Sequence, residues 1–287
     1  MQNDIVTQSP LSNRPESQIS SALSTKPAET APIHLPVIDP TSNPEILVFN
    51  LNDIKQLRNK YHILGILIGT LQQYPQQNIF LSVPLKLNIY EVLWLVQYQY
   101  AVLIDQLAYR NAKLKKQEEQ FQGKVKNDSL TEKNIMVVEN CDPNYDAKLA
   151  ESFEISIELY LSRYFRNSSG KSLARFINHY KYYKYLQNCG FYINPGLKFG
   201  GDLVIYPGDP LRYHSYSMVK FDVVDMYDII VGGRLATSVK KNLILMELKG
   251  EETIDDSQVS VDDKFLKQLF DDDDELVCFS IEWAGFG

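Results

Sequence analysis

From residue 171 onward, apolar strand-like segments alternate with segments of helical periodicity, and this alternation limits the possible folds more than any other feature of the chain. Apolar residues at helical spacing predict a helix that begins near Leu173 and is capped by Gly190. A second helix is expected over 229–241. Short apolar runs predict strands over 202–206, 215–221, 242–246 and 276–283. We therefore expect an α/β unit over residues 171–287.

The composition of the chain changes twice before this unit. Residues 1–44 are rich in Ser, Pro, Thr, Asn and Gln without a hydrophobic period, which predicts a disordered tail. Residues 45–107 are expected to form a small α+β domain, and the polar, charged stretch 108–170 a helical linker. The elements expected in the small domain are a strand at 46–49, a helix with Asn52 as its N-cap, a strand over 63–71, an edge strand over 79–87 that contains Pro84, and a helix over 90–107.

The charge of the chain is unevenly distributed. With 29 Lys and Arg against 36 Asp and Glu, the net charge of -7 excludes a uniformly basic nucleic-acid binder. Residues 171–250, however, hold 11 basic against 6 acidic side chains, a balance of +5, whereas residues 251–287 hold 2 against 12, a balance of -10. We interpret the acidic run 271–275 as a solvated loop. The basic region remains suited to binding phosphates.

Cysteine usage and hydropathy bear on the compartment. Cys141, Cys189 and Cys278 form neither a CxxC pair nor a paired disulfide set, which favours a reducing, intracellular environment. No apolar stretch approaches the roughly 20 residues that a membrane span needs. The polar N-terminus also lacks the apolar core of a signal peptide.

The densest group of residues suited to catalysis lies at the end of the strand expected before residue 207. Tyr206 ends this strand, the turn Pro207–Pro210 follows, and His214 lies eight residues after Tyr206. Because a turn of this type folds back, Tyr206 and His214 can approach the same point. Arg234 and Lys241 come from the helix that follows.

Each of these side chains also has an ordinary structural explanation when it is considered alone. A strand tyrosine such as Tyr206 commonly packs in a core, a single histidine is commonly a satisfied polar group, and Lys241 could be a solvated helix end. Arg234 could pair with a carboxylate, and Trp283 in the last strand could fill the core. The case for catalysis rests on the combination.

A metal-dependent nuclease is an alternative. Glu247-Leu248-Lys249 matches the short ExK pattern of such enzymes, with Asp202 or Asp209 as the further carboxylate for Mg²⁺. The pattern is common and therefore weakly specific.

Three blocks of sequence, in order, resemble the tRNA-splicing endonucleases, and most of all the fungal form of the eukaryotic catalytic subunit that cuts the 3′ splice site. The first block joins 69–71, 77–85 and 91–95, the second joins 198–215 and 234–241, and the third is the ending 280–287. Together they cover roughly 46–107 and 171–287.

The resemblance implies a nuclease domain of the restriction-endonuclease-like type and assigns roles to residues. Tyr206, His214 and Lys241 fall on the catalytic triad of the family, as general acid, general base and stabiliser of the phosphorane. Arg234 and Trp283 fall on the positions that hold a bulge base of the RNA. No metal or other cofactor is implied, and the products are a 2′,3′-cyclic phosphate and a 5′-hydroxyl. These residue types suit the roles, since histidine titrates near pH 7 and lysine is a compact cation.

The resemblance also implies partners. The substrate is an intron-containing precursor tRNA, and the chain works in a heterotetramer with a second catalytic subunit and that subunit's scaffold. A small structural subunit is expected to pair with the C-terminal strand. The location implied is the nucleus or, in fungi, the cytoplasmic face of the mitochondrial outer membrane. A non-catalytic, RNA-binding scaffold subunit of the same complex is the other alternative, disfavoured because all three positions of the triad are filled.

Overall fold

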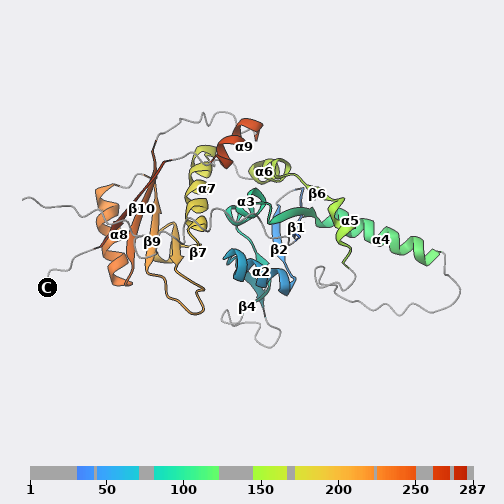
Figure 1. Ribbon diagram of the computed structural model, residues 1–287, viewed down its shortest axis with the longest axis horizontal. Coiled ribbons are helices and arrows are strands. Elements are labelled where there is room, and N and C mark those ends of the chain that lie inside the picture. Colours follow the sequence, from blue (N-terminus) through green and yellow to red (C-terminus); the bar gives the residue numbers. More distant parts are fainter. Residues whose placement is uncertain are drawn as a thin grey trace, which may run out of the picture.

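The computed structural model contains two sheets (Figure 1). One is formed by residues up to 166, here called the N-terminal half, and the other by residues from 172 onward, the second half. The structure describes residues 31–41, 44–70, 81–122, 145–166, 172–222, 225–249, 261–271 and 275–282. Among these residues, no helix is both long enough and apolar enough to cross a lipid bilayer.

The first sheet has the strand order β3-β4-β2-β1-β5-β6. Its strands are β1 (Ile33–Ile38), β2 (Glu45–Val48), β3 (Ile66–Thr70), β4 (Leu81–Lys86), β5 (Ala101–Asp105) and β6 (Glu154–Ile155). Strands β1 and β5 pair parallel, and the other neighbours pair antiparallel. The helices of this half are α2 (Leu51–Tyr61), α3 (Ile89–Gln97), α4 (Gln106–Gln122), α5 (Ala147–Glu151) and α6 (Ile157–Arg166).

The second sheet has the strand order β11-β10-β9-β8-β7. Its strands are β7 (Tyr192–Pro195), β8 (Leu203–Tyr206), β9 (Ser217–Phe221), β10 (Asn242–Leu248) and β11 (Leu276–Ile281), with a 3₁₀ turn, η1 (Leu197–Phe199), before β8. The helices are α7 (Leu173–Asn188), α8 (Met226–Ser238) and α9 (Asp263–Phe270). Strands β9 and β10 pair parallel and are joined through α8, whereas the other pairs are antiparallel. The predicted class, an α+β region followed by an α/β domain, is confirmed.

Helices α7 and α8 cover opposite faces of the second sheet. Met218 and Leu243 pack with Ala236 of α8 in a small apolar cluster. Alternate residues of the same strands, including Val219 and Ile244, belong to the main core together with α7. This division follows from strand geometry, in which successive side chains point to opposite faces.

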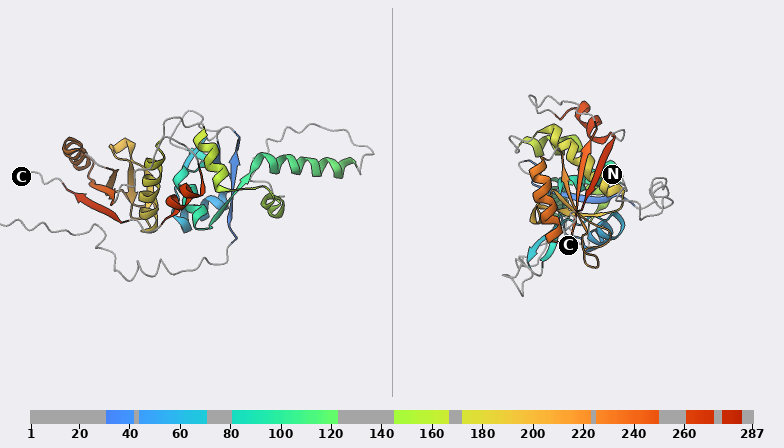
Figure 2. Two further views of the ribbon diagram at one scale, coloured as in Figure 1. Left: turned by 90° about the horizontal axis from the view of Figure 1, so that it is seen from above. Right: turned by 90° about the vertical axis from the view of Figure 1, so that its left-hand side faces the viewer.

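The two halves of the chain share one apolar core. Helix α7 stands between the second sheet and the N-terminal elements (Figure 2), and it contacts α3, α9 and β7. The Trp94 ring nitrogen on α3 donates a hydrogen bond of 2.9 Å to the Asn188 side chain at the end of α7. The Tyr180 hydroxyl on α7 donates to the Gln97 side chain at the end of α3. Both contacts lie beside the main core, which contains residues of both halves.

The start of α3 is fixed by a buried carboxylate. Asn88 is the N-cap of the helix, and Glu91 completes a capping box by accepting a 2.7 Å hydrogen bond from the Asn88 backbone N–H. The second Glu91 oxygen accepts from the Gly65 N–H at 2.9 Å, just before β3. Burial raises the pKa of Glu91 to about 7, against the opposing effect of these backbone donors. The carboxyl group therefore joins a helix start to the neighbouring sheet.

Three expectations for the N-terminal half are wrong in their boundaries. The tail expected over 1–44 ends too late, because β1 already belongs to the first sheet and Leu35 is fully buried. The helix expected over 90–107 is divided into α3, β5 and the start of α4, because the turn after α3 contains Gln99 with a positive φ of 58°. The linker expected over 108–170 contributes β6 to the first sheet.

The prediction that Pro84 marks an edge strand is also wrong. Strand β4 pairs with β3 on one side and β2 on the other. The β2 ladder reaches only Leu85 and Lys86, and the β3 ladder shifts register between Leu67 and Gly69. A proline, which has no N–H to donate, is accommodated at this irregularity.

Candidate active site

Three strand ends meet at one edge of the second sheet. Ile205 of β8 lies opposite Ser217 of the antiparallel β9, and Asn242 of the parallel β10 lies opposite the same Ser217. The C-terminal end of β8 and the N-terminal ends of β9 and β10 therefore lie side by side.

The residues predicted to form the triad come from these three ends. Tyr206 is the last residue of β8, His214 lies three residues before β9, and Lys241 directly precedes β10. Tyr206 is half-buried and His214 is exposed, so both can be reached from solvent. The fold thus brings together residues that are separated by as much as a helix and a strand in the sequence.

The Lys241 ammonium is held close to the histidine segment. Its Nζ donates a 2.6 Å hydrogen bond to the Ser215 carbonyl oxygen, one residue beyond His214. It also lies 4.8 Å from the centroid of the Phe199 ring. Desolvation by burial lowers the pKa of Lys241 from its usual value. A positive charge is thereby held against the backbone directly after His214.

The loop of residues 207–216, here called the β8–β9 loop, is organised around Asp209. The Asp209 carboxylate accepts from the Leu211 N–H at 2.9 Å, and its carbonyl oxygen accepts from the Arg212 and Tyr213 N–H groups at 2.8 and 3.0 Å. The Tyr213 ring packs so closely on Gly208 that an added Cβ would lie 2.6 Å from it. The turn predicted here is therefore a compact structure that ends at the candidate general base.

A residue from the other half of the chain completes this loop. Arg58 on α2 donates from Nη2 to Asp209 Oδ1 at 2.7 Å and from Nε to Oδ2 at 3.0 Å. The hydrogen bonds from Arg58 hold the pKa of Asp209 at about 2, below its usual value. The sequence pattern did not predict this contact, because 151 residues separate the partners and no local motif links them.

The same helix also contacts the strand that neighbours Tyr206. His62, at the C-terminal cap of α2, stacks on the Tyr192 ring with 4.5 Å between ring centroids. Tyr192 lies opposite Tyr206 in the β7–β8 ladder. The end of α2 thus supports both the β8–β9 loop and the edge of the sheet.

The two residues expected to hold an RNA base are placed unequally. Arg234 is exposed on α8. Trp283 lies outside the described residues, so the pairing of these two side chains stays a prediction.

Asp202 and Glu247, two residues of the alternative metal site, lie away from the candidate active site. Asp202 precedes β8 and Glu247 lies near the end of β10, at the opposite end of the sheet from the candidate active site. The Asp202 carboxylate accepts from the Phe221 N–H at 2.9 Å, and the Lys249 ammonium lies 2.9 Å from the Glu275 carboxylate. Within the described ranges, no group of three or more His, Cys, Asp or Glu side chains is arranged to bind a metal ion. The contacts of Asp202 and Lys249 therefore do not favour a Mg²⁺ site at this end of the sheet.

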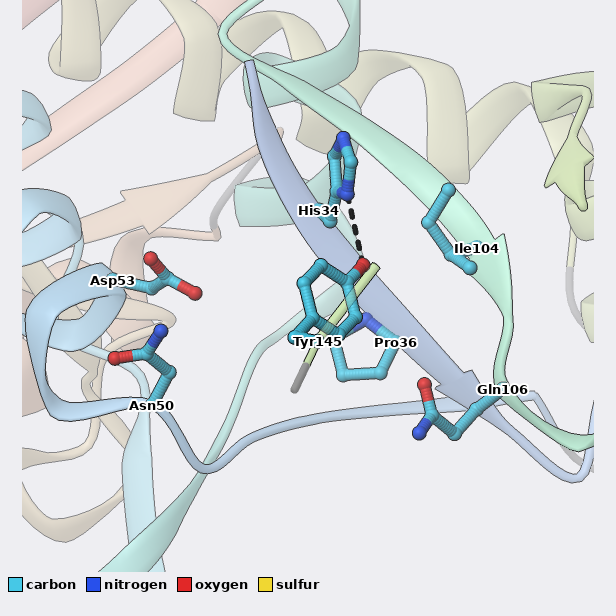
Figure 3. Close-up of a pocket in the computed structure, with 7 residues that line it drawn as sticks. All are labelled: His34, Pro36, Asn50, Asp53, Ile104, Gln106 and Tyr145. Carbon is cyan, nitrogen blue, oxygen red and sulfur yellow. Dashed lines mark hydrogen bonds between the residues drawn. The ribbon is translucent and has the colours of Figure 1, made fainter. Parts of the chain in front are cut away.

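Two cavities among the described residues lie at different distances from the candidate active site. One, of about 80 Å³, lies in the N-terminal half, where the Tyr145 hydroxyl and His34 Nδ1 are 2.8 Å apart and burial raises the pKa of Asp53 (Figure 3). It contains no residue of the candidate active site. The other, of about 130 Å³ and mostly apolar, lies between α7 and the sheet and is bordered by Pro207 and Tyr216 of the β8–β9 loop.

In the comparison with known proteins, the two halves of the chain match two different family models. Residues 37–106 match a family described as "TSEN34-like, N-terminal domain", and residues 176–256 match "tRNA intron endonuclease, catalytic C-terminal domain". The "Probable tRNA-splicing endonuclease subunit sen34" of Schizosaccharomyces pombe is 34% identical over 282 residues, which cover 85% of this chain and 95% of the relative. The chain belongs to the Sen34 family of tRNA-splicing endonuclease subunits.

Two further Sen34 proteins show how the similarity is distributed. The "tRNA-splicing endonuclease subunit SEN34" of Saccharomyces cerevisiae is 31% identical over 302 residues, covering 84% of this chain and 99% of the relative. The human "tRNA-splicing endonuclease subunit Sen34" is 41% identical over 70 residues, or 23% of each chain. The family resemblance predicted from the sequence is confirmed, and the β8–β9 loop lies in the part that matches the catalytic domain.

Proposed function

We propose that this Sen34-family chain cuts precursor tRNA at the 3′ splice site by metal-independent acid–base chemistry. His214 takes the proton of the ribose 2′-hydroxyl, whose oxygen attacks the adjacent phosphorus. The bond from phosphorus to the 5′-oxygen breaks, and Tyr206 supplies the proton for that oxygen. Lys241 stabilises the negative charge of the phosphorane. The products are a 2′,3′-cyclic phosphate and a 5′-hydroxyl.

One observation supports this proposal: three adjacent strand ends bring Tyr206, His214 and Lys241 to one edge of the sheet. The Lys241 ammonium lies 2.6 Å from the carbonyl oxygen of the residue after His214. A preorganised positive charge of this kind favours the developing oxyanion over the ground state. The balance of +5 over residues 171–250 suits contact with RNA phosphates.

The partners of the chain belong to the same proposal. Strand β11 is the last strand of the second sheet and pairs on one side with β10. A second protein chain can add a strand to such an edge. We assign this edge to a small structural subunit, and we place the chain in a heterotetramer with a second catalytic subunit and its scaffold.

The proposal is tested by reconstituting the complex with His214→Ala and supplying an intron-containing precursor tRNA. We expect cleavage at the 3′ site to fall by about 10²–10⁴-fold, because one acid–base partner is lost. Cleavage at the 5′ site, made by another subunit, should be unchanged and serves as the internal control. Normal 3′ cleavage would remove the catalytic assignment and favour a scaffold role.

Matched variants of two neighbouring lysines distinguish a catalytic role of Lys241 from a general effect of positive charge. Lys241→Met should lower 3′ cleavage, whereas Lys240→Asn should not, because Lys240 is exposed and its positive φ of 54° suits asparagine. Cleavage should also survive EDTA. Loss of activity that added Mg²⁺ restores would instead support a metal-dependent enzyme.

A further inference from the structure

The Arg58–Asp209 contact joins the N-terminal half of the chain to the β8–β9 loop, and it has no part in the chemistry proposed above. We propose that Arg58 is a positioning residue for His214, so that α2 of the N-terminal half takes part in the 3′ cleavage. This inference rests on the proposed function of His214.

The geometry of the contact is specific. Two parallel hydrogen bonds, of 2.7 and 3.0 Å, join the guanidinium group of Arg58 to both carboxylate oxygens of Asp209. The two side chains are only 29% and 24% exposed. A bidentate pair fixes direction as well as distance, which a single ionic contact between flexible side chains does not.

Asp209 transmits this constraint to the candidate base. Its side chain and its carbonyl oxygen together accept hydrogen bonds from Leu211, Arg212 and Tyr213, the three residues directly before His214. The position of Asp209, through its carboxylate and its main-chain carbonyl, therefore sets the path of the backbone that leads to the imidazole.

Helix α2 is itself held firmly against the second half of the chain. Gln187 of α7 donates a 2.7 Å hydrogen bond to the Tyr61 carbonyl oxygen at the end of α2. His62 Nδ1 lies 3.1 Å from the Gly190 carbonyl oxygen and stacks on Tyr192. Arg58 thus extends from a fixed support, which is the condition for a side chain to position a loop.

The base itself needs such support. Within the described part of the chain, the His214 side chain has no hydrogen-bond partner and is exposed. Without the Arg58 contact, the loop is expected to sample more conformations, and fewer of them place the imidazole at the 2′-hydroxyl. A displacement of about 1 Å can reduce a catalytic rate about 10²-fold.

The experiment uses the reconstituted complex with Arg58→Gln, Arg58→Lys, Asp209→Asn and the double variant Arg58→Gln/Asp209→Asn. Lys55→Gln is the matched control, since Lys55 is an exposed cation on the same helix. Single-turnover cleavage is measured at both splice sites over a range of RNA concentrations. Hydrogen exchange of residues 207–216 reports the order of the loop independently of activity.

We expect Arg58→Gln to lower the maximal 3′ rate about 10- to 100-fold. The RNA concentration for half-maximal rate and the 5′ rate should stay the same, and exchange in the loop should become faster. Arg58→Lys should be faster than Arg58→Gln but slower than the unchanged protein, because lysine keeps the positive charge but cannot form both hydrogen bonds of the guanidinium group. The double variant should be no slower than the slower single variant, since both changes remove one interaction.

Each opposite result overturns the inference. If Arg58→Gln matches Lys55→Gln in rate and in loop exchange, the contact does not position the base. If the effects of Arg58→Gln and Asp209→Asn multiply, the residues act separately. If His214→Ala leaves 3′ cleavage intact while Arg58→Gln alters loop exchange, the proposed function fails and the support of the loop by α2 remains.

Discussion

At the scale of single residues, the members of the proposed triad are held to different degrees. Lys241 is fixed by the Ser215 carbonyl and the Phe199 ring. Neither the Tyr206 hydroxyl nor the His214 ring has a hydrogen-bond partner within the described residues. The proposed acid and base are therefore free to bind substrate, whereas the proposed cation is already held in place without it.

The lowered pKa of Lys241 predicts how the proposed 3′ cleavage responds to alkaline pH. A lysine is charged below its pKa, and desolvation lowers this pKa, so the cation is lost at a lower pH than for an exposed lysine. Lys241→Arg should be slower near neutral pH but should keep its activity to higher pH, because a guanidinium group stays protonated. The measurement is the pH–rate profile at the 3′ site for both proteins. Identical alkaline limits would show that the ionisation of Lys241 does not set this limit.

The sequence alone predicted the triad residues but not their support. Tyr206 and His214 stand at either side of a turn whose proline and glycine residues are a local signal. Arg58 lies on a helix of the other half and carries no such signal. The sequence indicated Asp209 as part of the turn and as an alternative metal ligand, but not that its carboxylate binds Arg58. Contacts between distant segments depend on the packing of the whole chain, which local patterns do not contain.

At the scale of elements, local pattern predicted some of the strands and helices and missed others. The helix starting at Leu173 and the strands now called β8, β9, β10 and β11 were predicted close to their observed positions. Strand β7 and helix α9 were not predicted, since β7 contains an asparagine and a proline, which are rare in strands, and α9 lies within a strongly acidic stretch. The first helix begins two residues earlier than expected, because Asn50 rather than Asn52 is its N-cap.

Strand β11 provides a prediction at this scale. Phe279 on β11 is 55% exposed, although neighbouring Cys278 packs against the main core. Phe279→Glu should therefore leave the fold intact and weaken binding of the proposed structural subunit at this edge, because a charge opposes strand addition. Co-purification of the subunits measures this binding. Glu282→Gln is the control, because Glu282 is exposed and directly follows β11. Unchanged assembly of a folded Phe279→Glu protein would place the partner elsewhere.

At the scale of the whole molecule, two regions that match separate families form one apolar interior. The main core includes Leu93 of α3 and Tyr180 of α7, both fully buried. Trp94 is 8% exposed and binds Asn188 on α7. The boundary between the two family matches is therefore not a boundary in the packing.

A shared interior predicts cooperative unfolding. Trp94→Ala should lower the free energy of unfolding by about 3–5 kcal/mol, because it removes a large buried side chain and a hydrogen bond. Protection from hydrogen exchange should fall in both sheets together, including strands of the second sheet that Trp94 does not touch. Loss of protection in the first sheet alone would show that the halves unfold independently.

The pair formed by Arg58 and Asp209 predicts that the two positions evolve together. The two residues lie 151 positions apart, one in each region that matches a separate family. A change at one position alters the environment of the other, so substitutions at the two should be found together in lineages that depend on the contact. A hybrid gene that joins the first region of one species to the second region of another should support the full 3′ rate only where the two positions are compatible.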